Sequence, residues 1–430
     1  MTLEKYTSYK DSGVEWIGEI PEHWNITKLK YLGTSTIGLT YNPNDLCNKE
    51  EGTLVLRSSN IQNGKLTFDD NVYVKSNIPK KLFIKENDIL ICSRNGSREL
   101  IGKCAIAKKE DESYSFGAFT TVFRSKLNSY LFQILNSEIF KKQSGKFLTS
   151  TINQLTVGNL NSFEIPLPPK QEQIKIASFL DEKTTQIDEV ISQKDKLIEL
   201  LKERKQIVIN EAVTKGLDKT AEFKESGVEW IGKIPKHWEI SKLGTCLKPI
   251  SIKNKADLPL LSVTREQGVI LRDIDDKESN HNFIPDDLSG YKMVEKGQFA
   301  MNKMKAWQGS YGISDYTGIV SPAYFIFELN GIEPSFFHKA IRSSVYVPFF
   351  IKASDGVRIG QWDLSKSRMK EISFYIPPKD EQLQIVEYIE TQTTKIDNAI
   401  ELQQNYIAKL KEYKATLIDS VVTGKVRVAS

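Results

Sequence analysis

Two long segments of the chain carry the apolar periodicity of α-helices. Each begins at a double proline, at Pro168 or Pro377, and each ends close to a glycine, Gly216 or Gly424. Within both segments apolar residues recur at spacings of three and four, which is typical of a helix with one apolar stripe. Proline suits the approach to a helix, and glycine suits its end. We therefore predict two helices of about 40 residues, each about 60 Å long.

The apolar stripe of each predicted helix needs a partner, and the stripe of the other helix can supply it. A whole variable segment separates the two helices, so they can lie antiparallel as a coiled coil. The alternative is that each helix packs only on its own domain. The seam expected for the pair comprises Ile187, Val190, Leu197 and Leu201 in the first helix, and Ile396, Ala399, Tyr406, Leu410, Tyr413 and Leu417 in the second.

Shorter apolar runs precede each long helix and follow the same order both times. A strand-like run after a Lys-Glu or Glu-Lys turn is followed by two more strand-like runs, a helix-like stretch and a last strand that enters the double proline. This order predicts an α+β domain with a largely antiparallel sheet. The runs are residues 85–97, 102–109, 118–125, 129–143 and 163–169 in the first segment, and 295–310, 310–316, 322–329, 334–352 and 374–378 in the second.

The chain is thus written twice. A joint phrase, "SGVEWIGEIPEHW" at residues 12–24, returns as "SGVEWIGKIPKHW" at residues 226–238 with two differences, and the double-proline block also repeats. We divide the chain into domain 1 (1–167), a first helix (168–215), domain 2 (216–376) and a second helix (377–430). The two domains share a plan but not their loop residues, which is expected of a scaffold that carries two different recognition surfaces.

Composition limits the classes of protein. The chain has 430 residues, 40% of them apolar, and a net charge of +4, which suits two to four packed units and is compatible with nucleic-acid binding without demonstrating it. No secretory signal or membrane-spanning apolar run is visible, so we expect a soluble cytoplasmic protein with no membrane partner. The cysteines are scattered and form no zinc-binding pair, so reduced, mostly buried thiols are expected at Cys47, Cys92, Cys104 and Cys246.

A search for catalytic motifs finds none. The stretch "GSRELIGKC" at residues 96–104 has one residue too many between its glycines for a phosphate loop, and Cys104 where a hydroxyl should be. Neither the Asn-Pro-Pro-aromatic element of an amino-methyltransferase nor the carboxylate and lysine set of a nuclease is present. No metal-ligand spacing links His23, His237, His281 and His338. We expect a non-catalytic protein without cofactor or metal.

The repeated phrase, the repeated "IPLPPKQEQ" and "IPPKDEQ" and the long helices behind them resemble the specificity subunits of type I restriction–modification systems. The resemblance covers essentially the whole chain. It implies that each variable domain is a target-recognition domain that reads one half of a bipartite, asymmetric double-stranded DNA site. It also implies that the paired helices set the spacer and dock two methyltransferase subunits. Translocase–endonuclease subunits join in the full complex, and the specificity subunit does no chemistry itself.

Recognition of this kind would place the two domains about one helical turn of DNA apart, roughly 34 Å, facing two major grooves. Loops after strands are the natural places for base contacts, where Arg suits guanine, Asn and Gln suit adenine, and Lys more often meets phosphate. For each residue the alternative is an ordinary solvated side chain. The expected DNA-binding residues are Arg57, Ser58, Asn60, Ser93, Arg94, Asn95 and Arg98 in domain 1, and Arg265, Gln267, Lys303, Lys305, Trp307, Gln308 and Arg358 in domain 2.

The joint phrase is expected to connect each domain to the helices. Its tryptophans would be packing anchors, and its prolines, Pro21 and Pro235, would set the turn. Direct DNA contact by the phrase is the alternative. Two other functions stay open: a specificity subunit that serves a different kind of enzyme, and a coiled-coil scaffold with two protein-binding heads. The expected anchors are Trp16, Trp24, Trp230 and Trp238.

Overall fold

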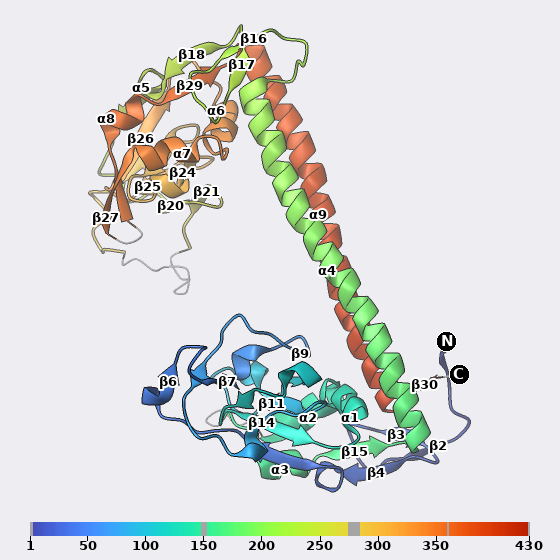
Figure 1. The fold of residues 1–430 in the computed structure, drawn as a ribbon. Coiled ribbons are helices and arrows are strands. Elements are labelled where there is room, and N and C mark those ends of the chain that lie inside the picture. The colour runs from blue at the N-terminus through green and yellow to red at the C-terminus, as the bar shows by residue number, and fades with distance from the viewer. Residues whose placement is uncertain (1–2, 148–152, 274–283, 359–360, 429–430) are drawn as a thin grey trace. The chain divides into compact units, whose positions relative to one another are not determined.

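The computed structural model describes residues 3–147, 153–273, 284–358 and 361–428. The chain divides into two compact units, residues 1–194 with 405–430 and residues 195–404. Both boundaries fall inside the long helices, so each unit contains one α+β domain and a part of each long helix (Figure 1). The predicted α+β class is confirmed.

Both long helices begin at the predicted prolines and end within two residues of the predicted glycines, but the second predicted segment (377–430) also contains strand β30 (Arg427–Val428), which pairs with β1 (Leu3–Glu4). Helix α4 spans Lys170–Lys215 and helix α9 spans Lys379–Val422, so each starts directly after its double proline. The backbone is left-handed at Gly216 and at Gly424, with φ of 68° and 71°, a conformation that glycine adopts at helix ends without strain. Among the described helices, none is both long and apolar enough to cross a membrane.

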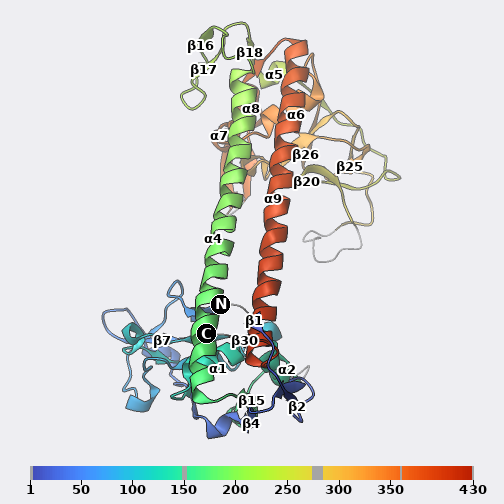
Figure 2. The ribbon, with the colours of Figure 1, turned by 90° about the vertical axis from the view of Figure 1, so that its right-hand side faces the viewer.

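Within each unit α4 and α9 run antiparallel (Figure 2). In the first unit, Asp188 of α4 accepts a hydrogen bond from Lys414 of α9 at 2.6 Å. In the second unit, Lys205 of α4 lies 2.7 Å from Asp397 of α9. The helices also pack on the domains: Phe179 of α4 belongs to the same apolar core as domain 1. The pairing of helices and their packing on the domains, set out above as alternatives, therefore occur together.

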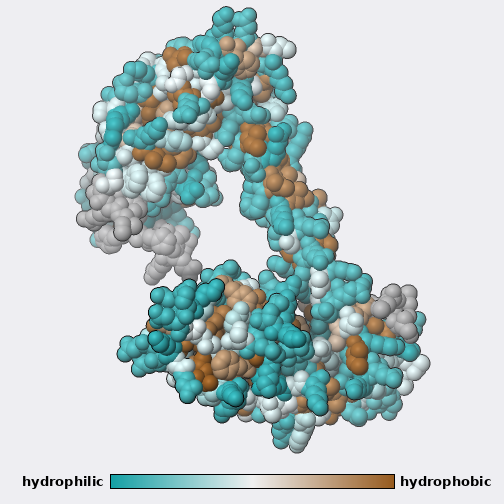
Figure 3. Space-filling model, in the orientation of Figure 1, coloured by the Kyte–Doolittle hydropathy of each residue, from teal (hydrophilic) through white to brown (hydrophobic). Residues whose placement is uncertain are grey.

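Four residues of the expected seam were wrong. Ile187, Leu201, Ile396, Ala399, Leu410 and Leu417 lie on the buried or half-buried stripe. Val190, Leu197, Tyr406 and Tyr413 instead have exposed fractions of 39%, 42%, 46% and 55%. Their neighbours Ile191, Ile198, Ile407 and Lys414 occupy the stripe. Each misplaced residue has an apolar or long neighbour one position away, so spacing alone did not decide which of the two faces the partner. Figure 3 shows hydrophobic side chains, coloured brown, on the visible surface of the long helices.

Domain 1 is built on two four-stranded sheets. One is antiparallel with order β12-β11-β14-β5, and the other has order β13-β7-β10-β6, with β13 parallel to β7. The predicted strand-like runs 85–97, 102–109 and 118–125 form β11, β12 and β14 of the first sheet, and β5, which was not predicted, completes it. The elements are β5 (Thr34–Ile37), β6 (Leu46–Cys47), β7 (Thr53–Leu56), β8 (Ile61–Gln62), β9 (Lys65–Leu66), β10 (Tyr73–Val74), β11 (Ile89–Cys92), β12 (Cys104–Ile106), β13 (Ser115–Phe116), β14 (Thr120–Arg124), α1 (Asn128–Leu135), α2 (Glu138–Phe147) and α3 (Val157–Asn161).

Among the described residues, domain 2 has one four-stranded antiparallel sheet, of order β19-β26-β23-β24, together with the hairpins β20-β21 and β27-β28 and the two-stranded sheet β22-β25. The predicted helix-like stretch forms two helices, as it does in domain 1. The elements are α5 (Leu243–Cys246), β19 (Leu247–Ile250), β20 (Leu261–Thr264), β21 (Gly268–Leu271), β22 (Lys292–Val294), β23 (Phe299–Asn302), β24 (Tyr311–Ile313), β25 (Gly318–Val320), β26 (Tyr324–Leu329), α6 (Pro334–Ile341), α7 (Val347–Lys352), β27 (Ser354–Arg358), β28 (Gln361–Leu364) and α8 (Lys366–Lys370).

Each domain is closed by a strand pair next to its long helix. In domain 1, β4 (Asn25–Lys28), which follows the joint phrase, pairs antiparallel with β15 (Glu164–Leu167), which precedes α4. In domain 2, β18 (Glu239–Lys242) pairs in the same way with β29 (Ser373–Ile376) before α9. The phrase and the double proline are therefore brought together twice by the same local topology.

Candidate nucleic-acid interface

The last two residues of each joint phrase form hydrogen bonds with a glutamate in the first turn of a long helix. Trp24 is fully buried, and its Nε1 donates a hydrogen bond to Glu172 Oε2 at 3.0 Å. His23 Nε2 lies 2.7 Å from the other carboxylate oxygen, Oε1. The Tyr6 hydroxyl donates to Oε2 at 2.9 Å. These contacts fasten the phrase to α4 at the joint where anchors were expected.

The second copy repeats this contact in unit 2. Trp238 is buried, and its Nε1 donates to Glu381 Oε1 at 3.1 Å. His237 Nε2 lies 2.8 Å from Glu381 Oε2. Thr220 stands at the sequence position that corresponds to Tyr6. The two joints therefore share a Trp–His–Glu core, and the tyrosine belongs to the first alone.

The first tryptophan of each phrase contacts a helix of its own domain. The ammonium of Lys146, in α2, lies 3.4 Å from the centroid of the Trp16 ring, and that of Lys352, in α7, lies 4.4 Å from the Trp230 ring. Trp230 Nε1 also donates to the Val345 carbonyl oxygen at 3.1 Å, and its ring is partly exposed. Each phrase thus holds its domain with one tryptophan and the long helix with the other.

The first joint also shifts the ionisation of its groups. Burial alone would raise the pKa of Glu172, but hydrogen bonds from His23, Trp24 and Tyr6 to the carboxylate outweigh burial, so the net pKa lies below its ordinary value. Burial and the hydrogen bond to Glu172 raise the pKa of the Tyr6 hydroxyl. At neutral pH the joint therefore contains a carboxylate and a protonated phenol.

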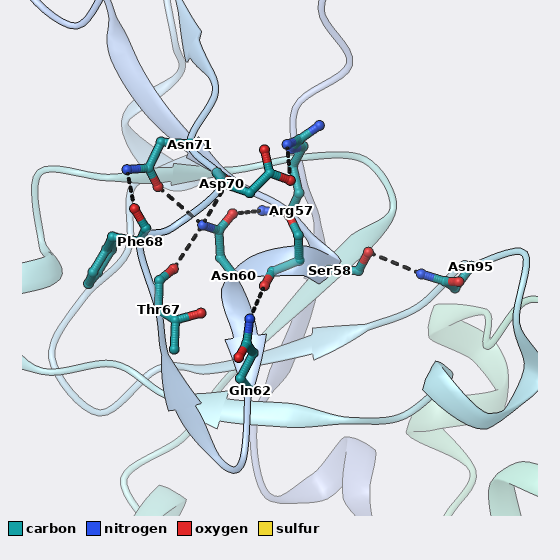
Figure 4. A network of polar contacts seen from close by, with 10 residues as sticks. Arg57, Ser58, Asn60, Gln62, Thr67, Phe68, Asp70, Asn71 and Asn95 are labelled. Atoms are coloured by element: carbon teal, nitrogen blue, oxygen red, sulfur yellow. Dashed lines mark hydrogen bonds and ion pairs between the residues drawn. The ribbon is translucent and has the colours of Figure 1, made fainter. Parts of the chain in front are cut away.

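A polar network orders the loop after β7 in domain 1 (Figure 4). Asn60 has no exposed surface, and its Nδ2 donates to the carbonyl oxygens of Thr67 and Asp70 at 2.9 and 3.2 Å. Its Oδ1 accepts from the Arg57 backbone N–H at 2.9 Å. The Arg57 guanidinium lies 2.8 Å from Asp70 Oδ2. Asn60 therefore braces the loop from inside and is not placed to contact DNA, which corrects its expected role.

The β11–β12 loop joins this network through one contact. Asn95 Nδ2 donates to Ser58 Oγ at 3.1 Å, so two residues predicted to bind DNA lie side by side. Ser93 is buried and its hydroxyl contacts Thr121, which makes it a second interior residue and not a surface contact. Arg94 is exposed, and its guanidinium lies 5.2 Å from the centroid of the Phe119 ring. Sequence reasoning missed Phe119, a largely exposed aromatic residue.

The remaining residues predicted for domain 1 are available at its surface. Arg98 is exposed, with its guanidinium 3.3 Å from the Gly145 carbonyl oxygen. Arg57, Ser58 and Asn95 are half-buried. The loops after β7 and β11 thus carry five of the predicted residues at the surface, while Asn60 and Ser93 lie buried beneath them. The surface residues are Arg57, Ser58, Arg94, Asn95 and Arg98.

In domain 2 the predicted residues fall into two loops. Arg265 and Gln267 are exposed in the β20–β21 turn. The turn after β23 carries exposed Lys305 and half-buried Gln308. The side chain of Arg358 lies outside the described residues, as does His281.

The β27–β28 hairpin contacts the turn after β23 through side chains. Lys303 lies 3.0 Å from Asp363. Trp307, in the 3-10 turn Ala306–Gln308, stacks on Trp362 with ring centroids 5.0 Å apart and an interplanar angle of 21°. The predicted residues Lys303 and Trp307 therefore attach the hairpin to this loop.

Arg342, at the end of α6, fastens the two loops of domain 2 together. Its guanidinium donates to the carbonyl oxygens of Arg265 at 2.8 Å, Glu266 at 2.9 Å and Tyr311 at 2.6 Å. One turn earlier, His338 Nδ1 accepts the Ile313 backbone N–H at 3.1 Å. Burial and the nearby charges of Arg342 and Lys339 lower the pKa of His338 to about 4, so this imidazole is neutral at pH 7. No sequence pattern pointed to Arg342, because its partners are backbone atoms that only the fold brings together.

Metal ligation and the four cysteines are the remaining candidates for chemistry in the sequence. Among the described residues, no group of three His, Cys, Asp or Glu side chains could hold a metal ion. Cys92, Cys104 and Cys246 are buried free thiols and Cys47 is half-buried, as predicted. Burial raises the pKa of Cys104 to about 12, which keeps this thiol protonated.

The fold defines a class: two α+β domains of one plan, each fastened by a Trp–His–Glu joint to a pair of long antiparallel helices. Residues 21–200 match the family model described as "Type I restriction modification DNA specificity domain". Over nearly its whole length the chain is similar to specificity subunits of type I restriction–modification systems.

Relatives match over nearly the whole chain. The specificity subunit of the type I restriction enzyme EcoKI from Escherichia coli K12 is 25% identical over 95% of this chain and 90% of its own. A putative MjaX specificity subunit from Methanocaldococcus jannaschii is 26% identical over 96% of each chain. A solved chain of a type I R-M system aligns with TM-score 0.67 at 15% identity, covering 94% of this chain and 98% of that one. The HsdS subunit from Thermoanaerobacter tengcongensis aligns with TM-score 0.52 at 16% identity over 94% and 98%. These two structures share the fold.

Proposed function

We propose that this chain is the specificity subunit that gives a DNA methyltransferase and endonuclease complex its target sequence, with each domain reading one half of a bipartite, asymmetric site in the major groove. The observation that carries the proposal is the contrast inside the repeat. The joints keep the same Trp–His–Glu contact in both copies, whereas the loops differ in their residues and in the side chains that brace them. A repeated framework with divergent loops suits two readings of different sequences.

The exposed residues of the loops have the chemistry of base and phosphate recognition. In domain 1, Arg94 and Asn95 can pair bidentately with guanine and adenine, respectively. In domain 2, Gln267 and Gln308 suit adenine, and Lys305 suits phosphate. Hydrogen bonds from Asn60 in domain 1 and from Arg342 in domain 2 hold these loops in place. The loop side chains are therefore already ordered in the free protein, which lowers the entropic cost of binding DNA.

The long helices are proposed to set the spacer between half-sites and to dock two methyltransferase subunits. Val190, Leu197, Tyr406 and Tyr413 leave the seam and expose apolar surface on the helix pair. Exposed apolar side chains on a helix surface are candidate contacts for a partner protein. Restriction subunits would join the same assembly, and this chain would contribute recognition without catalysis.

Sequencing of genomic methylation tests the proposal. Cells that express this chain with a candidate methyltransferase subunit are compared with cells that lack the chain. A methylated bipartite motif should appear only when the chain is present. No new motif, with both proteins expressed and associated and the methyltransferase active with another specificity subunit, would reject the proposal in favour of a protein-binding scaffold.

A further inference from the structure

A pocket lined by lysines lies in domain 2 between the central sheet and the start of α8. Its volume is about 220 Å³, which is room for a phosphate group and part of its sugar. Lys292 enters it from β22, and Lys366 from the first turn of α8. The remaining lining residues come from two neighbouring strands and the loop after β19: Pro249, Ile250, Ser251, Phe325, Ile326 and Phe327.

The charge at this pocket is uncompensated. Among the described residues, neither Lys292 nor Lys366 has a carboxylate within ion-pair distance. The Lys292 ammonium donates to the Tyr324 carbonyl oxygen at 2.7 Å, and the Lys366 ammonium lies 5.7 Å from the centroid of the Phe325 ring. Burial, reinforced by the charges of Lys253, Lys366 and Lys303, lowers the pKa of Lys292. An anion would satisfy the free ammonium donors and relieve this repulsion.

The lining favours phosphate among anions. Lysine ammonium groups act as compact point charges that suit phosphate, whereas planar carboxylates are matched better by the fork of arginine. The apolar rings around the pocket lower the local dielectric constant and strengthen an ammonium–phosphate contact. Lysine contacts of this kind position a protein on DNA without reading its sequence.

The pocket is connected to the loops that carry the predicted base contacts. Lys366 follows β28 by two residues. The Leu364 backbone N–H, at the end of β28, donates to the Lys303 carbonyl oxygen at 3.2 Å. Lys303 in turn begins the turn that presents Lys305 and Gln308. One DNA duplex could therefore supply a phosphate to the pocket and base edges to the loop.

We propose that the pocket between Lys292 and Lys366 binds a backbone phosphate of double-stranded DNA and positions domain 2 on the duplex. The inference rests on the proposed function of this chain. It adds a phosphate contact that reads no sequence to the loops that read bases.

The test measures DNA affinity of the full-length chain over a range of salt concentrations, with a labelled duplex of mixed sequence. Each phosphate contact contributes about 0.9 to the slope of log affinity against log salt concentration. The double variant K292Q/K366Q should bind mixed-sequence DNA more weakly and show a slope shallower by about 0.9. The charge-retaining K292R/K366R should keep most of the slope, and K236Q, which removes an exposed lysine paired with Glu222, should leave it unchanged.

The outcomes separate this inference from the proposed function. If the unmodified chain shows no salt-dependent DNA affinity, the proposed function itself fails. If the chain binds but K292Q/K366Q keeps the full slope with an unchanged melting temperature, the pocket does not bind DNA phosphate. Calorimetry with inorganic phosphate adds a third arm. Binding of phosphate that K292Q/K366Q abolishes, together with an unchanged DNA slope, would make the pocket a small-anion site and overturn the assignment to DNA.

Discussion

The two joints are near copies of each other, whereas the two sets of loops are braced by different chemistry. In both joints a buried tryptophan and a histidine hold one glutamate of a long helix. In domain 1 the loop after β7 is braced by the neutral amide of Asn60, and in domain 2 two loops are braced by the guanidinium of Arg342. The joints, which attach a domain to a helix in both copies, keep the same residues. The loops differ between the two domains, and so do the side chains that hold them in place.

The largest expected effect is at the joints. Trp24→Ala and Trp238→Ala each remove a buried indole and a hydrogen bond to a carboxylate, so each should destabilise its unit by about 3–5 kcal/mol. Trp230→Ala, at the partly exposed first tryptophan of the second phrase, is the matched control and should cost less. Urea unfolding monitored by circular dichroism measures the difference. Equal losses at Trp238 and Trp230 would contradict the distinct roles assigned to the two tryptophans.

The seam of the helix pair comes next. Ile198→Ala removes a buried side chain and should cost about 2–4 kcal/mol. Leu197→Ala, one position away, removes a partly exposed side chain and should cost less than about 1 kcal/mol. Thermal unfolding of the two variants in parallel checks the register. A larger loss at Leu197 would restore the seam predicted from spacing.

The loop braces should have a smaller effect on stability and a local effect on specificity. Arg342→Met leaves the carbonyl groups of Arg265, Glu266 and Tyr311 without donors, and Asn60→Ala does the same to Thr67 and Asp70. Each should cost about 1–3 kcal/mol. The contrast appears in the methylation pattern, where each variant should relax the half-site of its own domain alone. Relaxation of both half-sites by one variant would show that the braces are not local.

The smallest expected effect is the pH dependence of the first joint. The pKa of Glu172 is lowered in the folded chain, so its stabilising contribution is present above the ordinary value of 4.5 and is lost as the pH falls through the lower folded value. Glu172→Gln should cost about 1 kcal/mol at pH 7 and should weaken the acid dependence of stability. Unfolding curves between pH 3 and pH 7, roughly the range of carboxylate titration, measure both effects. An unchanged acid dependence in Glu172→Gln would remove the carboxylate from this role.

The sequence predicted the architecture because the architecture is repeated and periodic. Helix limits followed from proline and glycine, and the domain plan followed from the order of apolar runs. The seam was predicted less well, since apolar neighbours such as Leu197 and Ile198 satisfy the same spacing within one residue. Asn60 and Ser93 have side chains suited to base contacts, but both are buried and make hydrogen bonds inside domain 1 that the sequence does not reveal. The role of Arg342 could not be predicted either, because its partners are backbone carbonyl oxygens that only the fold brings together.

The central claim is that each domain reads its own half-site, and methylation mapping with one variant per domain tests it most directly. Arg94→Ala in domain 1 and Gln308→Ala in domain 2 are expressed separately with the same methyltransferase subunit, and the methylated motif is read from the genome. Arg94→Ala should relax one base position in one half-site, at a cost of about 1–3 kcal/mol in discrimination, and Gln308→Ala should relax a position in the other half-site. Changes that fall in the same half-site for both variants, or weaken methylation uniformly without altering the motif, would contradict the claim.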